Sequence, residues 1–416
     1  MVQEHLQSAL GLIALRAVAW LLSEQRKLVS WQFAALGTGA QIVLAFVLLE
    51  LPFAPTLFSE LSRGVLAIQG ATEAGSSFVF GFLGGGPLPY EETRPGASLV
   101  FAFRFLPLII VISSLASLLI YWRVLPAIVS GFAWIFERVL HIGGAVAVSS
   151  AANIFLGMVE SSILIRPYIK ELTRNELFTV MCVGLGGVAG TVLVLYATML
   201  APVIPNAAGH LLVATVITVP GSIVIARIMI PETSPSTPGS LVRDKDVHGP
   251  IEAIMSGAKQ GLELFLIIIA TLLVFVALVY LLDEFLGLLP NFHGAALTLE
   301  RVVGWLFAPV AWLVGVPWHE ARIVGSLLGT KTVVNELIAY RQLSVLPPAV
   351  LSDRSRLLAT YALCGFANFG SVGILAAGLA TMAPARRAEI AQLGLRALLG
   401  ATLANCSTAA IVGILM

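Results

Sequence analysis

The chain has 416 residues, of which 58% are hydrophobic and only 11% are charged, and its mean hydropathy is +0.94. Soluble domains usually carry about 25% charged residues, so the composition excludes a water-soluble fold. The formal net charge of +1 and the absence of long Lys or Arg runs also exclude binding of nucleic acid as a polymer.

Apolar segments long enough to cross a membrane recur along almost the whole chain, since about 20 such residues span roughly 30 Å of hydrocarbon. They predict an all-α polytopic membrane protein with eight transmembrane helices, at about 6–22, 35–53, 98–121, 176–200, 207–229, 261–288, 355–382 and 391–416. The run from Ala9 to Leu22 lacks a basic n-region and a cleavage site, so we expect a membrane helix there and not a signal peptide.

Three apolar regions, 54–95, 143–170 and 300–342, are interrupted by Gly, Pro, Asn and charged residues. Irregular backbone survives at membrane depth only where protein or a water-filled cavity satisfies it. These regions therefore predict interfacial helices and re-entrant helical hairpins.

The distribution of Lys and Arg predicts the orientation in the membrane, because such residues are enriched in cytoplasmic loops. They follow the first, third, fifth and seventh spans, as Arg26, Lys27, Arg123, Arg138, Arg227, Arg243, Lys245, Arg386 and Arg387. Both termini are then expected on the outer, periplasmic side of the inner membrane. Arg341, Arg354 and Arg356 depart from this pattern, since they precede span seven on the predicted outer side.

The segments from Asn153 to Pro202 and from Gly329 to Pro384 share one pattern. Each has a broken hairpin with a Glu at its tip, followed by a Gly-rich span that contains a cysteine and ends in Ala-Thr-Met. Three crossings separate the two hairpins, so they would enter from opposite sides. An inverted repeat of discontinuous helices is typical of secondary transporters with a binding site near the midplane.

Glu160 and Glu336 are the strongest candidates for chemistry, because an ionisable group at membrane depth costs at least about 2.5–3.5 kcal/mol on insertion scales. The alternative is that either Glu caps a helix at the headgroup level, but their corresponding positions in the repeat favour function. Asn368, Gly370 and Ser371 interrupt span seven near its middle, as Gly184, Gly186, Gly187 and Gly190 interrupt span four. Carbonyls at such breaks can coordinate a cation, although small-residue packing explains the span-four glycines equally well.

Six segments in this order resemble the concentrative nucleoside transporters: Gly-Ser-Ser-Phe-Val-Phe-Gly at 75–81, Asn-Ile-Phe-Leu-Gly-x-x-Glu at 153–160, Leu-Phe-Ala-Pro at 306–309, Gly-Val-Pro-Trp at 315–318, Lys-Thr-Val-Val-Asn-Glu-Leu-Ile-Ala-Tyr at 331–340 and Ala-Leu-Cys-Gly-Phe-Ala-Asn at 362–368. The resemblance covers essentially the whole chain. It implies a secondary active symporter that forms a homotrimer, in which a transport domain moves like an elevator against a scaffold.

The resemblance also implies a division of the chain. Residues 1–142 would be mainly scaffold, 143–229 the first transport-domain repeat, 230–299 a cytoplasmic loop with scaffold span six, and 300–416 the second repeat. Carried over to this sequence, the first hairpin tip, Gly157, Met158, Val159 and Glu160, would read the nucleobase. Glu336, Asn368 and Ser371 would hold the ribose hydroxyls, and Phe366 would line the same pocket.

The departures from the family pattern concern the first tip and the cation. Nucleoside-carrying members usually have Gly-Gln-Thr-Glu or Gly-Gln-Ser-Glu where this chain has Gly157-Met158-Val159-Glu160, so two base-reading polar side chains have become apolar. Sodium-coupled members also use that hydroxyl and a span-four Ser as ligands, and the Ser position aligns with Gly187. The remaining ligands would be Asn153 and the carbonyls of Leu156 and Val188.

Two lost hydroxyl ligands favour protons over sodium as the coupling cation. Glu160 or Glu336 would carry the proton, because a buried carboxyl holds its proton more readily than an exposed one. His319 is a weaker candidate. Sodium coupling, and transport of a modified nucleoside or another ribose-bearing solute, stay open as alternatives.

We expect no enzyme, since no paired Asp, HExxH or Ser/Lys arrangement occurs, and no channel. We expect no cofactor, disulfide framework or metal site, because Cys182, Cys364 and Cys406 lie in apolar runs without CxxC spacing. The expected partners are a nucleoside-like small molecule, membrane lipid and two further copies of the chain.

Overall fold

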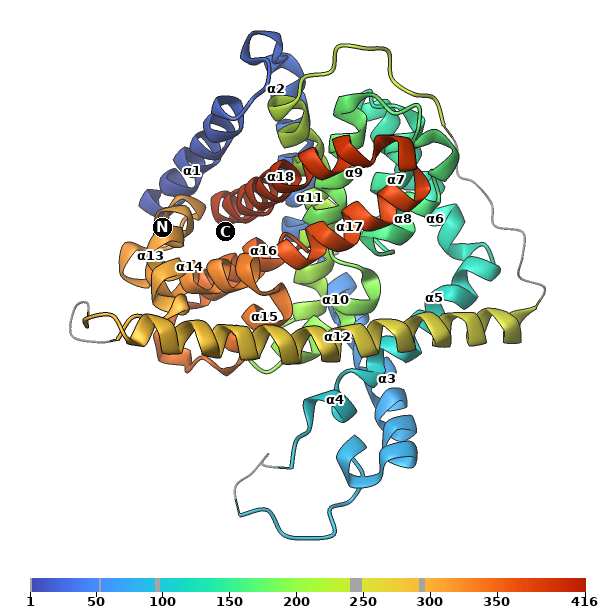
Figure 1. Cartoon of the computed structure of the whole chain (residues 1–416), viewed down its shortest axis with the longest axis vertical. Helices are drawn as coiled ribbons and strands as arrows, with labels where there is room; N and C mark the ends of the chain where they lie inside the picture. The colour runs from blue at the N-terminus through green and yellow to red at the C-terminus, as the bar shows by residue number, and fades with distance from the viewer. Residues whose placement is uncertain (1, 52–53, 94–97, 240–248, 292–295) are drawn as a thin grey trace.

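A computed structural model describes residues 2–51, 54–93, 98–239, 249–291 and 296–416, and this part of the chain is helical without strands (Figure 1). The α-helices are α1 (Val2–Leu21), α2 (Trp31–Glu50), α3 (Ala54–Phe80), α4 (Phe101–Arg104), α5 (Pro107–Tyr121), α6 (Val124–Leu140), α7 (Gly144–Ala152), α8 (Met158–Ile163), α9 (Arg174–Gly186), α10 (Gly190–Leu200), α11 (Ala207–Met229), α12 (Pro250–Gly287), α13 (Leu299–Val314), α14 (Trp318–Val333), α15 (Glu336–Val345), α16 (Asp353–Leu363), α17 (Phe369–Met382) and α18 (Arg387–Leu415). Short 3₁₀ turns lie at Arg26–Leu28, Gly81–Gly84, Arg166–Tyr168, Pro348–Val350 and Pro384–Arg386.

The same order of elements occurs twice. A helix (α6 or α13) precedes a pair of short helices (α7 and α8, or α14 and α15). A broken span follows (α9 and α10, or α16 and α17), and a long unbroken helix (α11 or α18) closes the unit. The predicted repeat therefore corresponds to a repeated succession of helices.

Six helical stretches are long and apolar enough to cross a membrane: Trp31–Glu50, Phe101–Tyr121, Arg174–Leu200, Ala207–Met229, Pro250–Gly287 and Pro384–Leu415. The number rises to seven if α13 and α14, which are bent by 116°, form one span. The predicted number of eight, which also includes α1 and the broken pair α16 and α17, stays a prediction.

Most predicted bounds agree with the helices, and two differ. The predicted span 207–229 coincides with α11, whereas the sixth span begins at Pro250 and not at 261. The expected loop after span three is the 17-residue helix α6. Its apolar residues include five buried positions on one face. Arg123, directly before the helix, and Arg138, in its last turn, had favoured a loop.

Polar side chains start several of the helices by accepting hydrogen bonds from backbone N–H groups that lack a partner in the first turn. Thr173 and Glu176 form a reciprocal capping box at α9. Asn335 caps α15 and Asn368 caps α17. Thr173, Asn335 and Asn368, three polar interruptions of the apolar pattern, thus mark helix starts.

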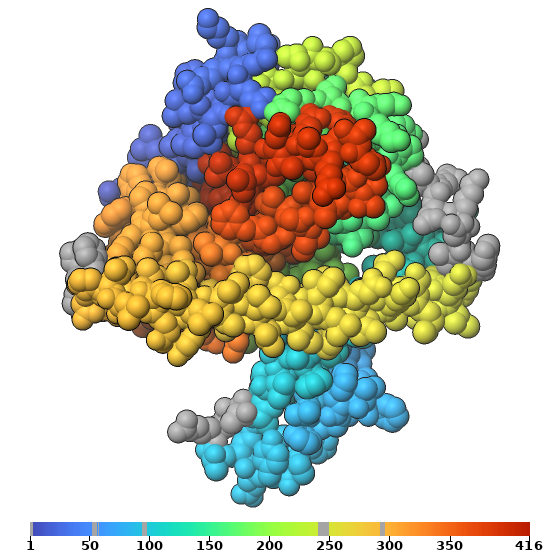
Figure 2. All heavy atoms as spheres, viewed as in Figure 1, coloured from blue at the N-terminus to red at the C-terminus, as the bar shows by residue number. Residues whose placement is uncertain are grey.

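The long helices differ in burial. In the most apolar stretch of α11, 89% of the residues are buried. In the corresponding stretch of α12, only 6% of the residues are buried. Figures 1 and 2 show α12 running along the outside of the molecule, with α3 and α4 in a lobe that projects beyond it. The apolar surface of α12 is therefore available to lipid or to another subunit.

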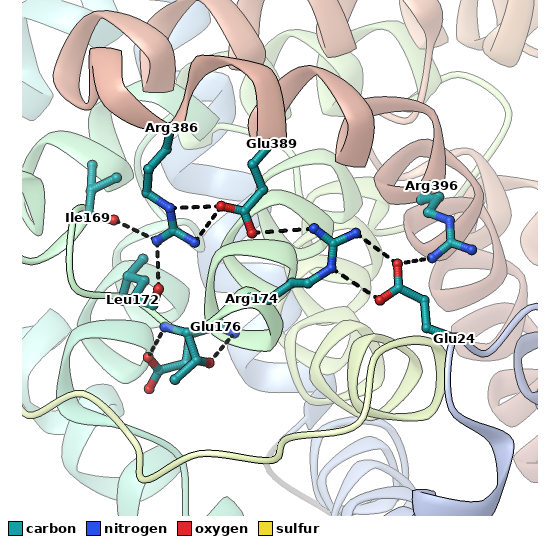
Figure 3. Close-up of polar contacts among 9 residues, drawn as sticks. Glu24, Ile169, Leu172, Arg174, Glu176, Arg386, Glu389 and Arg396 are labelled. Carbon is teal, nitrogen blue, oxygen red and sulfur yellow. Dashed lines mark hydrogen bonds and ion pairs between the residues drawn. The ribbon is translucent and has the colours of Figure 1, made fainter.

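The two termini lie together, since His5 Nδ1 is 3.0 Å from the Ile414 carbonyl oxygen. At the other ends of α1 and α18, Glu24 binds Arg174 and Arg396, and Glu389 binds Arg174 and Arg386 (Figure 3). We call these five residues the ionic cluster. It joins the loops that follow the first and seventh spans, two of the four loops predicted to share one side. Arg243 and Lys245, in the loop after the fifth span, lie outside the described residues.

Candidate functional site

The two broken spans meet at their breaks. The break between α9 and α10 lies at residues 187–189, and that between α16 and α17 at residues 364–368. Phe366 N donates a hydrogen bond to the Gly187 carbonyl over 3.2 Å. A Cβ at Gly365 would lie 2.5 Å from the Gly186 carbonyl oxygen, so only glycine permits this approach. Non-helical backbone is thereby buried inside the protein.

The buried Glu336 carboxylate lies beside this crossing, at the first residue of α15. Its Oε1 accepts a hydrogen bond of 2.7 Å from the Tyr196 hydroxyl, and its Oε2 accepts one of 2.9 Å from Asn368 Nδ2. A helix N-terminus also favours a carboxylate. Residues from α10, α15 and the start of α17 therefore converge on one acceptor.

Asn368 has two roles in this arrangement. Its Nδ2 donates to Glu336, and its Oδ1 accepts from Ser371 N over 2.7 Å, which caps α17. Ser371 is 7% exposed and Phe366 is half-buried. Hydrogen bonds thus bring together Glu336, Asn368 and Ser371, the three residues expected to hold the ribose. Phe366, expected to line the same pocket, lies in the same break.

The first hairpin tip has a different environment. Met158 is buried against α9, where its Cβ lies 3.3 Å from the position of a Cβ at Gly184. Val159 packs against α17, with its Cγ1 3.0 Å from the position of a Cβ at Gly378. The tip therefore contacts both broken spans through apolar side chains.

Glu160 is exposed, and its carboxylate folds back over Gly157. In the described part of the chain, no hydrogen bond joins Glu160 to the Glu336 group. Burial was the reason for predicting that Glu160 or Glu336 carries the proton. Glu336 is buried and Glu160 is not.

The expected cation ligands lie around the first break. Asn153 Nδ2 donates to the Val183 carbonyl over 2.8 Å, and a Cβ at Gly187 would fall on that amide group. Val188 is buried, and Leu156 lies in the turn that precedes the first hairpin tip. Gly190 N donates to the Phe155 carbonyl over 3.1 Å, which joins the hairpin to the break. Among the described residues, no group of three or more His, Cys, Asp and Glu gathers that could hold a metal ion.

Sequence reasoning missed three polar residues of this region, Tyr196, Lys331 and Asn405. Tyr196 donates to Glu336, and Lys331 Nζ contacts Asn405 Oδ1 over 2.8 Å. Asn405 lies inside an apolar span, so the signal that selected Asn368 could have found it. Tyr196 had no such signal, because a tyrosine in a span is commonly a packing residue.

Chemically, the site offers the Glu336 carboxylate, with lone pairs that remain free, beside the Asn368 amide and the Tyr196 hydroxyl. A carboxylate has about four acceptor positions, and the side chains of Tyr196 and Asn368 each take one of them here. Two vicinal hydroxyls could donate to the others through charge-assisted hydrogen bonds.

Three family models match the chain in succession. One described as Na+ dependent nucleoside transporter N-terminus matches residues 10–83, one described as Nucleoside recognition matches 102–203, and one described as Na+ dependent nucleoside transporter C-terminus matches 210–413.

Full-length relatives match as well. The nucleoside permease NupC of Helicobacter pylori is 33% identical over 421 residues, which cover 100% of this chain and 98% of NupC. The structure of CNTnw in an inward-facing substrate-bound state is 36% identical with a TM-score of 0.90, and 98% of each chain is covered. A double variant of CNTnw in an outward-facing state is 35% identical with a TM-score of 0.92, covering 100% of this chain and 99% of that one.

Proposed function

This chain belongs to the concentrative nucleoside transporter family, whose members are multi-pass membrane transporters and not enzymes, and from that premise we propose that it imports nucleosides by symport with a cation, protons ahead of sodium. The observation that carries the proposal is the Glu336 carboxylate, which is buried at the crossing of two broken spans and held by Tyr196 and Asn368. A buried carboxylate with open acceptor positions suits a substrate that brings hydroxyl donors into the membrane.

In this proposal the ribose hydroxyls donate to the Glu336 oxygens, and Asn368 and Ser371 complete the pocket. The N-cap geometry of Asn368 fixes its amide beside the carboxylate, so little conformational entropy is lost on binding. Phe366 would cover the sugar or the base. The first hairpin tip, Gly157 to Glu160, would contact the base.

The proposal of proton coupling rests on the residues at the first break. Val159 and Gly187 supply no hydroxyl, so the remaining candidate ligands at this break are Asn153 Oδ1 and backbone carbonyls, while Asn153 Nδ2 donates to the Val183 carbonyl. Proton coupling through Glu336 needs no further oxygen ligands, which supports protons even though two of the matching family models are named for sodium. Sodium coupling is the alternative within the same fold.

The cargo has a second candidate, a modified nucleoside or another ribose-bearing solute. Met158 and Val159 present apolar side chains where polar ones usually read the base. A tip that forms no hydrogen bonds to the base would accept bases with altered polar edges, while the ribose contacts stay the same.

The proposed movement is that of an elevator. Residues 143–229 and 300–416 would form the transport domain, with α7–α8 and α14–α15 as re-entrant hairpins, and residues 1–142 and 230–299 would contribute mainly scaffold. Eight spans would put both termini on one side of the inner membrane, and the Lys and Arg bias of the loops supports the periplasmic side. The exposed apolar surface of α12 supports a homotrimer in which this helix faces lipid or a neighbouring copy.

The test is uptake into proteoliposomes with a panel of labelled nucleosides, under separately imposed proton and sodium gradients. Gradient-driven accumulation of at least one nucleoside is the expected result. Uptake that only equilibrates, whichever gradient is imposed, would contradict symport.

A further inference from the structure

A second charged side chain is buried beside the proposed binding site. Lys331 lies in the last turn of α14 and is only 2% exposed. Its Nζ donates to the Ala362 carbonyl over 2.9 Å and to Asn405 Oδ1 over 2.8 Å. An ammonium taken out of water is costly unless several acceptors hold it, so this position is unlike that of an ordinary packing residue.

Asn405, in the middle of α18, is fully buried and extends the network. Its Nδ2 donates to the Gly186 carbonyl over 2.7 Å and to the Cys364 carbonyl over 2.8 Å. The Gly186 carbonyl is at the end of α9, directly before the first break, and the Cys364 carbonyl belongs to the second break. One asparagine therefore holds both breaks together, and Lys331 fixes the orientation of its amide because an ammonium can face only the amide oxygen.

Lys331 and Asn405 hold the backbone next to the proposed binding residues. The Ala362 and Cys364 carbonyls, held by Lys331 and Asn405, flank the segment that leads to Phe366 and Asn368. Phe366 N in turn donates to the Gly187 carbonyl. Lys331 also lies five residues before Glu336, and the positive charge of its ammonium interacts electrostatically with that carboxylate.

We propose that Lys331 and Asn405 are positioning residues for substrate recognition: the Lys331 ammonium acts as a tethered cation that, through Asn405, joins the two helix breaks and holds Asn368 at the Glu336 carboxylate. The inference rests on the proposed ribose contacts of Glu336 and Asn368. It assigns no substrate contact to Lys331 or Asn405.

The decisive measurement is the ribose discrimination ratio, which is the Kd of the 2′,3′-dideoxy analogue divided by the Kd of the best-bound ribonucleoside in purified protein. We expect Lys331→Met to weaken ribonucleoside binding by about tenfold or more, as for one lost charge-assisted hydrogen bond, and to leave dideoxy binding within about twofold. The ratio therefore falls towards one. A loss of folded protein alone would not change this ratio.

Two further variants separate positioning from folding. Asn405→Asp keeps an acceptor for Lys331 but removes both donors to the breaks, and should lower the ratio in the same way. The double variant Lys331→Met with Asn405→Leu removes both partners and should fold better than Lys331→Met alone, yet its ratio should stay low. Ser407→Ala is the matched control, because the hydrogen bond of this buried α18 hydroxyl in the described part of the chain goes to the Leu403 carbonyl of its own helix.

The outcomes are distinguishable. If wild type does not discriminate against the dideoxy analogue, the ribose assignment fails and this inference fails with it. If wild type discriminates and folded Lys331 or Asn405 variants retain the wild-type ratio, only the positioning role is overturned.

Discussion

At the scale of single residues, the charge of Glu336 should matter more than its size. Glu336→Gln keeps the volume but removes the charge and one of the two acceptor oxygens. Charge-assisted hydrogen bonds are roughly twice as strong as neutral ones, so the variant should lose nucleoside uptake while it stays folded. Uptake per folded molecule in proteoliposomes is the measurement.

Glu320→Gln is the matched control for this variant. Glu320 is also buried in the second hairpin region, where its carboxylate accepts from Ser352 N over 3.1 Å and from Ser352 Oγ over 3.0 Å. Its loss should affect stability and not transport per molecule. Normal uptake by folded Glu336→Gln protein would contradict the proposal that Glu336 binds the substrate or carries the coupling cation.

The second residue-scale prediction concerns Asn368 and Ser371. Alanine at either position should weaken ribonucleoside binding by about 0.5–1.5 kcal/mol for each lost hydrogen bond. Asn368→Ala also removes the cap of α17, at a cost of about 1 kcal/mol in stability. Asn368→Asp separates these effects, since a carboxylate keeps the cap but cannot donate to Glu336.

Competition between labelled ribonucleoside and its 2′- and 3′-deoxy analogues gives the measurement for both positions. The analogues should compete poorly in wild type and comparatively better in the variants. Equal binding of ribonucleosides and deoxy analogues to wild type would show that ribose is not recognised here.

At the scale of elements, the ionic cluster holds the loop after α1 against the starts of α9 and α18 (Figure 3). The hydrogen bond from Arg174, together with nearby positive charge, lowers the pKa of Glu24. A lowered pKa in the folded state means that Glu24 contributes stability above its unfolded pKa and loses that contribution as the pH falls through the folded value. The cluster is solvent-accessible, so the contribution is modest.

Glu24→Gln should therefore destabilise the protein by roughly 0.2–1 kcal/mol at pH 7 and by less in acid. Thermal unfolding of both proteins in detergent at neutral pH and near pH 4 measures this difference. Glu60→Gln is the control, because the Glu60 pair with Arg63 lies within one helix. A difference from wild type that grows as the pH falls would contradict a stabilising, ionised Glu24 carboxylate.

Local signals explain which elements could be predicted. Apolar length located the long helices, and clustered Gly with a mid-span Asn located both breaks. The helix α6 was missed because it follows α5 after only two residues, with Arg123 directly before it and Arg138 in its last turn. Apolar length does not separate such a short amphipathic helix from a loop.

Contacts between distant residues explain what could not be predicted at the site. Tyr196 lies 140 positions from Glu336, and Asn405 lies 74 positions from Lys331. Their pairing depends on how the two broken spans cross, which no local pattern records. For Glu160, in contrast, a local pattern gave a wrong prediction. Its position in the repeat predicted a buried carboxylate, and the side chain is exposed.

At the scale of the whole molecule, the coupling cation decides how transport is driven. With Val159 and Gly187 in place of two hydroxyls, chiefly Asn153 and the carbonyls of Leu156 and Val188 remain as ligands. These are too few to hold sodium, so uptake should persist when choline replaces sodium. It should collapse when a protonophore removes the proton gradient.

The double variant Val159→Thr with Gly187→Ser tests the same point in reverse and should gain at most partial sodium dependence. A Cβ at Gly187 would fall on the Asn153 amide, so a serine there must displace the hydrogen bond between Asn153 and the Val183 carbonyl. That displacement frees the Asn153 amide to turn its oxygen towards a cation, but it also loosens the packing of the first hairpin on α9. Uptake measured in parallel in sodium, in choline and with the protonophore separates these effects. Wild-type uptake that scales with sodium and ignores the protonophore would refute proton coupling, and would mean that carbonyls and water complete a sodium site without hydroxyl ligands.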